Sequence, residues 1–322
     1  MCKMRFAGSL TKVDRDKARI EIFGVPFDGN AVLKGARKGP MAIRRASHTL
    51  ETFLWRKEVE ISETLFADAG DIAVSFPPRR KFEEKTAWEV SVQPPLRSER
   101  RKIFLGGDHS VTFALVKHLF ERGFVEKVFV LDAHADFRES YKGNRFSNAC
   151  VLRRIVELVG AENVVAIGVR SASAEEYEAL HFRALHFRRK RGRGQGEWQG
   201  EKKGELRIYD AWRVREDLRG VLSELASERD VAGKNAYLSV DVDVLDPCVA
   251  PAVEYPEPCG LSVSEVLSLI NGIFASSNVV AADVVEVNPR MERRNRITSV
   301  SAARIVMEIL ACMHEQEERA GR

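Results

Sequence analysis

The sequence predicts one α/β domain of three-layer α/β/α architecture, built on a single, mainly parallel sheet of about eight strands. Three observations predict this fold. The 322 residues are enough for a large core, short apolar runs alternate with amphipathic stretches almost to the end of the chain, and the connections between them are mostly short. Such alternation is typical of a parallel sheet covered by helices on both faces. A (β/α)8 barrel has the same periodicity, so the pattern alone leaves it open.

The predicted strands are short runs rich in branched and aromatic side chains. Near-continuous apolar runs of this kind are expected where both faces of a parallel sheet are buried. In chain order the runs are Ile20–Phe27, Leu65–Asp68, Lys102–Leu105, Lys127–Asp132, Val164–Val169, Arg207–Tyr209, Ala236–Val242 and Val279–Val287.

Amphipathic stretches between these runs are predicted as helices. The first opens with Gly-Pro, and two others are followed directly by glycine, which are the usual signs of a helix start and a helix end. They are Pro40–Trp55, Ser110–Arg122, Cys150–Val159, Ser262–Ile273 and Thr298–Met313. We find no internal repeat, so residues 1–322 are predicted to form a single domain.

Two polar segments interrupt this pattern. Residues 181–204 are rich in Gly and Arg and predict a solvated insertion. From Arg183 to Arg207 there are nine Lys or Arg against three Glu, a local charge of +6, so the remainder of the +4 chain sums to −2. Because the insertion holds a single Trp198 for base stacking, no nucleic-acid partner is expected. Ser75–Arg100 is a second irregular, charged connection.

The cysteine pattern and the apolar runs bear on the cellular environment. Five cysteines without CxxC spacing predict free thiols in a reducing cytosol rather than a disulfide framework or a zinc knuckle. Neither a secretory signal nor a transmembrane helix is expected, because no apolar run of about 20 residues is present. The chain is therefore predicted to be a soluble cytoplasmic protein with no membrane partner.

Acidic and histidine side chains follow three of the predicted strands directly. Carboxylates at such positions are costly to desolvate unless they are paired or bind cations. The carboxyl ends of parallel strands also form the usual ligand crevice. The clusters are Asp108 and His109 after the third strand; Asp132, His134 and Asp136 after the fourth; and Asp241 and Asp243 after the seventh.

Four of these carboxylates and the two imidazoles suit two divalent cations. Manganese is favoured because it accepts mixed oxygen and nitrogen ligands and no thiolate stands at these motifs. Two ions about 3.5–4 Å apart can share one water and lower its pKa enough to supply hydroxide near neutral pH. Single acids such as Asp108 and Asp246 are explained more simply as residues that form turns, without a metal.

The motifs together resemble those of the ureohydrolase (arginase/agmatinase) family, in its agmatinase-like branch. The resemblance covers most of the chain and rests on GGDHS at 106–110, DAHAD at 132–136 and SVDVDVLDP at 239–247. It is supported by GVPFDGN at 24–30, FADAGDI at 66–72, IGVRSASAEEYEAL at 167–180, PEPCGLS at 256–262 and ADVVEVNP at 282–289. The resemblance implies an arginase-like fold and a homo-oligomer, either a trimer or a hexamer.

The resemblance also implies a role for each site residue. His109 and Asp136 would bind the first manganese ion, His134 and Asp243 the second, and Asp132 and Asp241 would bridge the two ions. Glu286 would bind the guanidinium group, since a carboxylate matches its paired N–H donors. Asp136 would also pass a proton toward the leaving nitrogen.

Two positions depart from the family pattern. Asn148 stands where relatives carry a histidine that shuttles protons, and an amide cannot carry a proton at pH 7. Turnover is therefore expected to be slower, by about 10²–10⁴-fold for a lost general acid–base group, unless His118, His181 or a water substitutes. Glu254 and Tyr255 replace a small Gly/Thr-rich turn and are predicted to bind substrate, where a carboxylate and a phenol would set its selectivity. Glu254 either contacts a cationic substrate end or points to solvent.

The implied reaction is hydrolysis of a small cationic guanidino compound to urea and an amine. Agmatine giving putrescine, a step of polyamine biosynthesis, is the first choice, because Glu254 would favour a substrate with a distal cation. Arginase, guanidinobutyrase and formiminoglutamase activities remain alternatives. A metal-binding homologue that has weakened catalysis or a regulatory role is a further alternative, motivated by Asn148.

Overall fold

A computed structural model describes residues 4–11, 14–75, 91–92, 100–181, 205–227 and 233–321. Almost all of the predicted insertion at 181–204 therefore lies outside the described residues. The same holds for most of the irregular connection Ser75–Arg100, of which residues 76–90 and 93–99 are not described.

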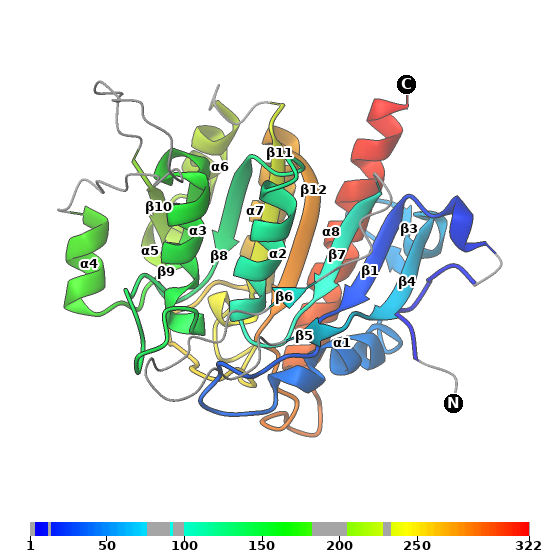
Figure 1. The fold of residues 1–322 in the computed structure, drawn as a ribbon. Coiled ribbons are helices and arrows are strands. Elements are labelled where there is room, and N and C mark those ends of the chain that lie inside the picture. The colour runs from blue at the N-terminus through cyan, green and yellow to red at the C-terminus, as the bar shows by residue number, and fades with distance from the viewer. Residues whose placement is uncertain are drawn as a thin grey trace.

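Eight parallel strands form one open sheet in the order β10-β9-β8-β11-β12-β7-β1-β4 (Figure 1). Each strand corresponds to one that the sequence predicts, although most bounds shift by one to three residues. The bounds are β1 Ile20–Gly24, β4 Phe66–Asp71, β7 Arg101–Leu105, β8 Lys127–Leu131, β9 Val164–Val169, β10 Arg207–Asp210, β11 Asn235–Asp241 and β12 Asn278–Val285. Because β10 and β4 are edge strands that do not pair with each other, the barrel alternative is wrong.

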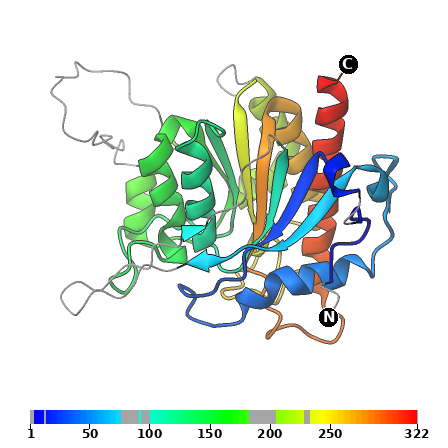
Figure 2. The same cartoon turned by 45° about the vertical axis from the view of Figure 1, so that its right-hand side comes forward.

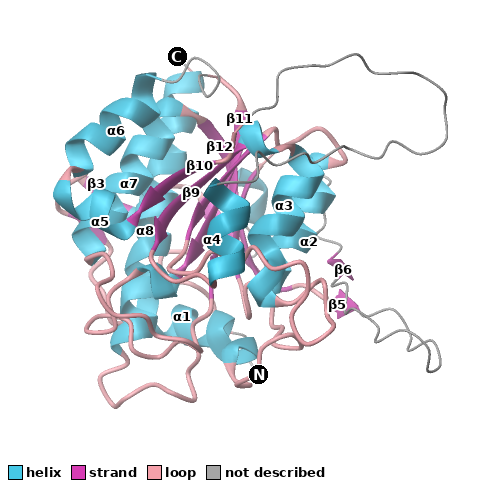
Figure 3. Ribbon diagram, turned by 90° about the vertical axis from the view of Figure 1, so that its left-hand side faces the viewer, coloured by secondary structure: helices cyan, strands magenta, loops and turns pink. Residues whose placement is uncertain are grey.

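Helices cover both faces of this sheet, as Figures 2 and 3 show. One buried apolar cluster joins the sheet to α2 (Ser110–Phe120), α3 (Val151–Val159) and the end of α4 (Ala174–His181). A second joins the opposite face to α1 (Gly39–Ser47), α5 (Ala211–Glu216), α6 (Leu218–Ser227), α7 (Val263–Ser276) and α8 (Ile297–Ala320). The predicted three-layer α/β/α architecture is confirmed.

The predicted helix Pro40–Trp55 is wrong in its second half. Helix α1 ends at Ser47, and Phe53–Leu54 form β2, which pairs antiparallel with β3 (Val59–Glu60). The run Thr-Phe-Leu-Trp favours an extended chain, in which Leu54 is buried while Trp55 is 85% exposed. The sequence analysis did not predict α4, α5 and α6, which have 8, 6 and 10 residues.

Helix α8 is long and apolar enough to pass a test for a membrane span. However, 78% of its apolar window is buried inside the fold, where it packs against α1, α7 and β12. This burial accounts for its composition without a membrane.

Strands from distant parts of the sequence meet at the centre of the sheet. The neighbours β8, β11, β12 and β7 all run in the same direction, so their carboxyl ends lie along one edge. At β8–β11 and at β12–β7 the sequence order jumps, and such switch points create a crevice beyond the strand ends. The acidic and histidine motifs follow these strands.

Candidate metal centre

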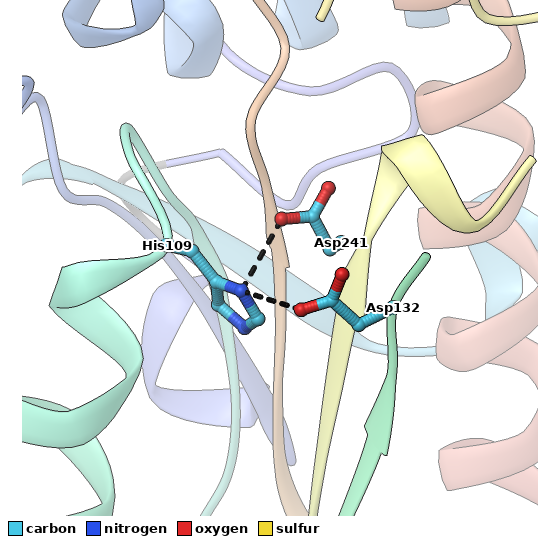
Figure 4. Close-up of side chains that lie close together, drawn as sticks. All are labelled: His109, Asp132 and Asp241. Carbon is cyan, nitrogen blue, oxygen red and sulfur yellow. Dashed lines mark ion pairs between the residues drawn. The ribbon is translucent and has the colours of Figure 1, made fainter. Parts of the chain in front are cut away.

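His109 lies at the middle of the strand-end crevice. It immediately precedes α2, is 1% exposed, and directs its Nδ1 atom at carboxylates from the segment after β8 and from the end of β11 (Figure 4). The Nδ1 atom is 3.1 Å from Oδ2 of Asp132, 3.2 Å from Oδ2 of Asp241 and 3.3 Å from Oδ2 of Asp136. Three carboxylates thus converge on one imidazole nitrogen.

His134 forms a second group beside the first. Its Nδ1 atom is 2.9 Å from Oδ2 of Asp243 and 3.7 Å from Oδ1 of Asp132. The ligand atoms of His109, Asp132 and Asp241 lie within 4.8 Å of one another, as do those of Asp132, His134 and Asp243. Asp132 belongs to both groups and therefore links them.

The turns that follow the strands orient these carboxylates. Oδ1 of Asp132 accepts a hydrogen bond from the amide of His134 at 2.7 Å, and Oδ1 of Asp241 accepts one from the amide of Asp243 at 2.9 Å. Oδ1 of Asp243 accepts from the amide of Ala133 at 3.0 Å. Each aspartate has a backbone partner on one oxygen, and its second oxygen faces the imidazoles.

The donor set fits divalent cations. Nδ1 of His109 is buried, and none of the three surrounding carboxylates is aligned to accept a hydrogen bond from it. Clustered carboxylates repel one another unless a proton or a cation lies between them. Carboxylate and imidazole donors without a thiolate favour a cation that accepts oxygen and nitrogen ligands, of which manganese is one.

The pKa values show how tightly protons and charges are coupled at this centre. Burial lowers the pKa of His134, but the charge of Asp243 and hydrogen bonds to Asp132 and Asp243 outweigh it and raise the value to about 12. The pKa of His109 is raised well above its usual value because the surrounding carboxylates outweigh burial. Burial and the charge of Asp132 raise the pKa of Asp136 to about 7.

Glu286 follows β12 and is buried against His109. Its Oε1 atom accepts a hydrogen bond from the amide of His109 at 2.7 Å, whereas its Oε2 atom is buried without a partner. Glu286 and Asp136 have φ values of 66° and 45°, which is the left-handed region that non-glycine residues rarely adopt. Such strained residues concentrate at functional sites.

A buried carboxylate supports His109 from behind. Asp283 is fully buried in β12 and accepts hydrogen bonds from Tyr237 (2.6 Å), Ser239 (2.7 Å) and Thr112 (2.8 Å). Oγ of Ser239 lies 3.3 Å from Nε2 of His109. Because Ser239 donates its proton to Asp283, it accepts from Nε2, so Nδ1 is the nitrogen that can lose its proton and ligate a cation between the three carboxylates.

These groups line a cavity of about 460 Å³. Its wall includes His109, His134, Asp136, Asp241, Asp243 and Glu286, together with Arg138, Tyr141, Asn148, Glu176, Glu254, Tyr255 and Glu257. The structure therefore brings the residues singled out in the sequence to one place, with Asp132 buried behind the wall between the two histidines.

Glu254 is 5% exposed, so the solvent-directed reading of this residue is wrong. Its Oε1 atom accepts hydrogen bonds from the amides of Val32 (2.6 Å) and Leu33 (2.9 Å), and its Oε2 atom lies 3.4 Å from Nδ2 of Asn148. The Tyr255 ring is 6.4 Å from that of His134. Burial, followed by the charges of Glu254 and Tyr141, raises the pKa of Tyr255 to about 12.

Sequence reasoning missed Asp283, because its three donors come from β11 and α2, which only the fold brings near. It also missed Arg138 and Tyr141, which line the cavity and stack with a 5.6 Å separation. Asp108 and Asp246 stabilise turns, as the sequence analysis predicts for single acids. Asp108 accepts hydrogen bonds from the amides of Asn30 and Ala31. Asp246 accepts them from the amides of Cys248 and Gly260.

Comparison with known proteins gives consistent matches. A protein-family model described as Arginase family matches residues 18–312. The chain is 35% identical to the agmatinase of Pyrococcus horikoshii over 95% of each chain, and 32% identical to the N(1)-aminopropylagmatine ureohydrolase of Thermococcus kodakarensis over 94% of this chain and 93% of that one. The crystal structure of agmatine ureohydrolase of Thermoplasma volcanium matches with a TM-score of 0.72 at 26% identity, covering 99% of this chain and 97% of that one.

Proposed function

The chain belongs to the arginase family, and from this we propose that it hydrolyses agmatine to putrescine and urea in a metal-dependent reaction. The observation that carries the proposal is one cavity that holds both the histidine–aspartate centre and the unpartnered oxygen of Glu286. Water supplies the oxygen of urea, the bond between the guanidinium carbon and the chain nitrogen breaks, and that nitrogen leaves as an amine.

We propose that two Mn²⁺ ions occupy the centre. His109, Asp136, Asp132 and Asp241 would hold one ion, and His134, Asp243, Asp132 and Asp241 the other. Such ions lower the pKa of a water molecule and polarise the substrate. The distances from the histidines to the aspartates support this assignment, although Asp241 lies close to His109 and is not grouped with His134.

Glu286 is proposed to bind the guanidinium group. Its Oε1 atom is held by the amide of His109, so the orientation of the carboxylate is fixed before substrate arrives. The buried Oε2 atom gains a charge-assisted hydrogen bond from the planar cation. This contact orients the guanidinium carbon toward the histidine–aspartate centre.

Asp136 is proposed to move the proton. Its carboxylate lies 3.3 Å from Nδ1 of His109 and lines the cavity, where it would accept a proton from the attacking water and release it to the leaving nitrogen. Asn148 lines the same cavity but cannot carry a proton, so Asp136 would act without the histidine that relatives use at this step.

The proposal is tested by measuring urea release with added manganese from agmatine, arginine, 4-guanidinobutyrate and formiminoglutamate. Agmatine is expected to give the highest kcat/KM, and Asn148→His is expected to raise kcat by restoring a proton carrier. Urea release from neither the natural chain nor the Asn148→His variant would instead favour a regulatory metal-binding homologue.

We further propose a cytoplasmic homo-oligomer, a trimer or a hexamer. The cysteines among the described residues, Cys150, Cys248, Cys259 and Cys312, are all free, which supports a reducing compartment. Sedimentation velocity would test the oligomeric state, and a purely monomeric species would contradict it.

A further inference from the structure

Two buried carboxylates face the same cavity without a cationic partner. Glu286 is 4% exposed and has one unpartnered oxygen. Glu254 is 5% exposed, and its hydrogen bonds come from two backbone amides and one side-chain amide; no lysine or arginine of the described residues pairs with it. Burying an unpaired charge is costly, so both positions are suited to bind cationic groups.

The two carboxylates also line one cavity of about 460 Å³, so that two like charges share one site. A ligand that places one positive charge near each carboxylate would relieve this repulsion. A ligand with a single cationic end would leave one of them uncompensated.

The two oxygens of Glu254 differ in what they contact. Oε1 is held by the amides of Val32 and Leu33 at 2.6 and 2.9 Å, which fixes the side chain against the loop after β1. Oε2 has a long contact, 3.4 Å, to Nδ2 of Asn148, and the hydroxyl of Tyr255 interacts with the same carboxylate. This oxygen is therefore able to accept a stronger, charge-assisted hydrogen bond from an ammonium group.

Asn148 keeps this negative charge available. Its Oδ1 atom accepts from the hydroxyl of Ser147 at 2.9 Å, which directs the amide nitrogen toward Glu254. An imidazolium at position 148 would pair with Glu254 and compete with a cationic ligand, whereas a neutral amide does not. The two departures from the family pattern are thus in contact and act on one carboxylate.

We infer that Glu254, kept free and oriented by Asn148, binds the terminal ammonium of the substrate and selects guanidino compounds that carry a second positive charge. This inference rests on the proposed function, because it assigns the guanidinium end to Glu286. It identifies Glu254 and Asn148 as specificity-determining residues of this chain.

The test compares agmatine with n-butylguanidine, which has the guanidinium but lacks the ammonium. In Glu254→Gln the amide oxygen still accepts from Val32 and Leu33, so only the charge is lost. The KM for agmatine is expected to rise about 10–100-fold, as for loss of a charge-assisted hydrogen bond, while kcat and all constants for n-butylguanidine stay within about threefold. Turnover of n-butylguanidine shows that the variant is folded.

Glu257→Gln is the matched control, because Glu257 is an acid of the same loop that also lines the cavity. A smaller rise in the agmatine KM is expected for this variant. An equal effect of both substitutions would show that general negative charge, and not Glu254, sets the preference.

Calorimetric titration of the manganese-loaded protein with both compounds gives the same comparison without turnover. If Glu254→Gln weakens agmatine and n-butylguanidine equally, Glu254 only holds the loop and the inference fails while the proposed function stands. If no guanidino compound releases urea, the proposed function fails, and the binding comparison still decides the role of Glu254.

Discussion

Glu286, which is buried, and Asp136, which is partly buried, are two acidic residues with a left-handed backbone at one cavity. For non-glycine residues this backbone costs roughly 1–3 kcal/mol each, and it persists only where the surroundings enforce it. The amide of Glu286 donates to the carbonyl of Gly107 at 2.8 Å while its carboxylate accepts from the amide of His109. The backbone and the carboxylate of Glu286 are thus both fixed. These contacts hold the strained backbone in place and orient the charged group.

Replacing Glu286 with Gln tests the guanidinium contact. The amide oxygen can still accept from the amide of His109, so the fold should be kept, but the charge that pairs with the guanidinium is lost. We expect kcat/KM for agmatine to fall about 10²–10³-fold, in the range for removing one partner of a buried charge pair. Steady-state urea release measures it; a change below about threefold would contradict the proposed contact.

The histidines also predict how cation binding depends on pH. A histidine must be neutral to ligate a metal, yet the pKa values of His109 and His134 are raised, the latter to about 12. Raised pKa values favour the protonated imidazoles when no cation is bound, so cation binding releases protons and the affinity increases as pH rises. The apparent Kd for Mn²⁺ should fall about tenfold per pH unit for each proton released.

This dependence can be measured by manganese titration calorimetry between pH 6.5 and 8.5 in buffers of different ionisation enthalpy, which also counts the protons. An affinity that is constant across this range would show that the histidines do not exchange protons for cations.

At the scale of elements, strand β12 supplies two carboxylates with opposite tasks. Glu286, just beyond its end, faces the cavity, whereas Asp283, three residues earlier, is buried among hydroxyls from β11 and α2. The two residues connect β12 to His109. Glu286 accepts from the backbone amide of His109, and Asp283 acts through Ser239, which contacts the His109 ring. A shift of β12 relative to β11 would therefore disturb His109 from both sides.

Replacing Asp283 with Asn tests this support. An amide cannot accept from all three hydroxyls, so Ser239 loses the orientation that makes it accept from Nε2 of His109. The affinity for Mn²⁺ should fall about 10–100-fold, as for other partners of metal-binding histidines. Tyr237→Phe is the matched control, because it removes one donor to Asp283 and leaves Ser239 in place; an equal loss in both variants would argue against a specific role for the Ser239 link.

The whole molecule assembles the centre from segments separated by most of the chain. His109 follows β7, Asp132 follows β8, Asp241 ends β11 and Glu286 follows β12. A cation at this centre joins the middle strands of the sheet. Local unfolding that separates these strands would release the cation. Cation binding should therefore stabilise the folded state as a whole.

Manganese is accordingly expected to raise the melting temperature. At about a hundredfold excess over Kd, a ligand specific for the folded state contributes about 2.7 kcal/mol. For a protein of this size that corresponds to a shift on the order of 5 °C, which a chelator should reverse. Differential scanning calorimetry measures the shift; Asp132→Asn, which alters the carboxylate shared by both groups, should abolish it, and an unchanged shift in that variant would argue against the shared centre.

The sequence by itself determined the eight strands, the layer architecture and the acids and histidines at the strand ends. Each of these depends on local periodicity or on a few neighbouring residues. Only the tertiary structure decided which strands are neighbours, that Asp283 supports His109, and that Glu254 is buried against Asn148. The Ser239–His109 and Asn148–Glu254 contacts join residues 130 and 106 positions apart, and all of these neighbours depend on long-range packing that no local pattern encodes. The end of α1 at Ser47 shows the same limit, since the pairing of β2 with β3 overrides the apparent helical pattern.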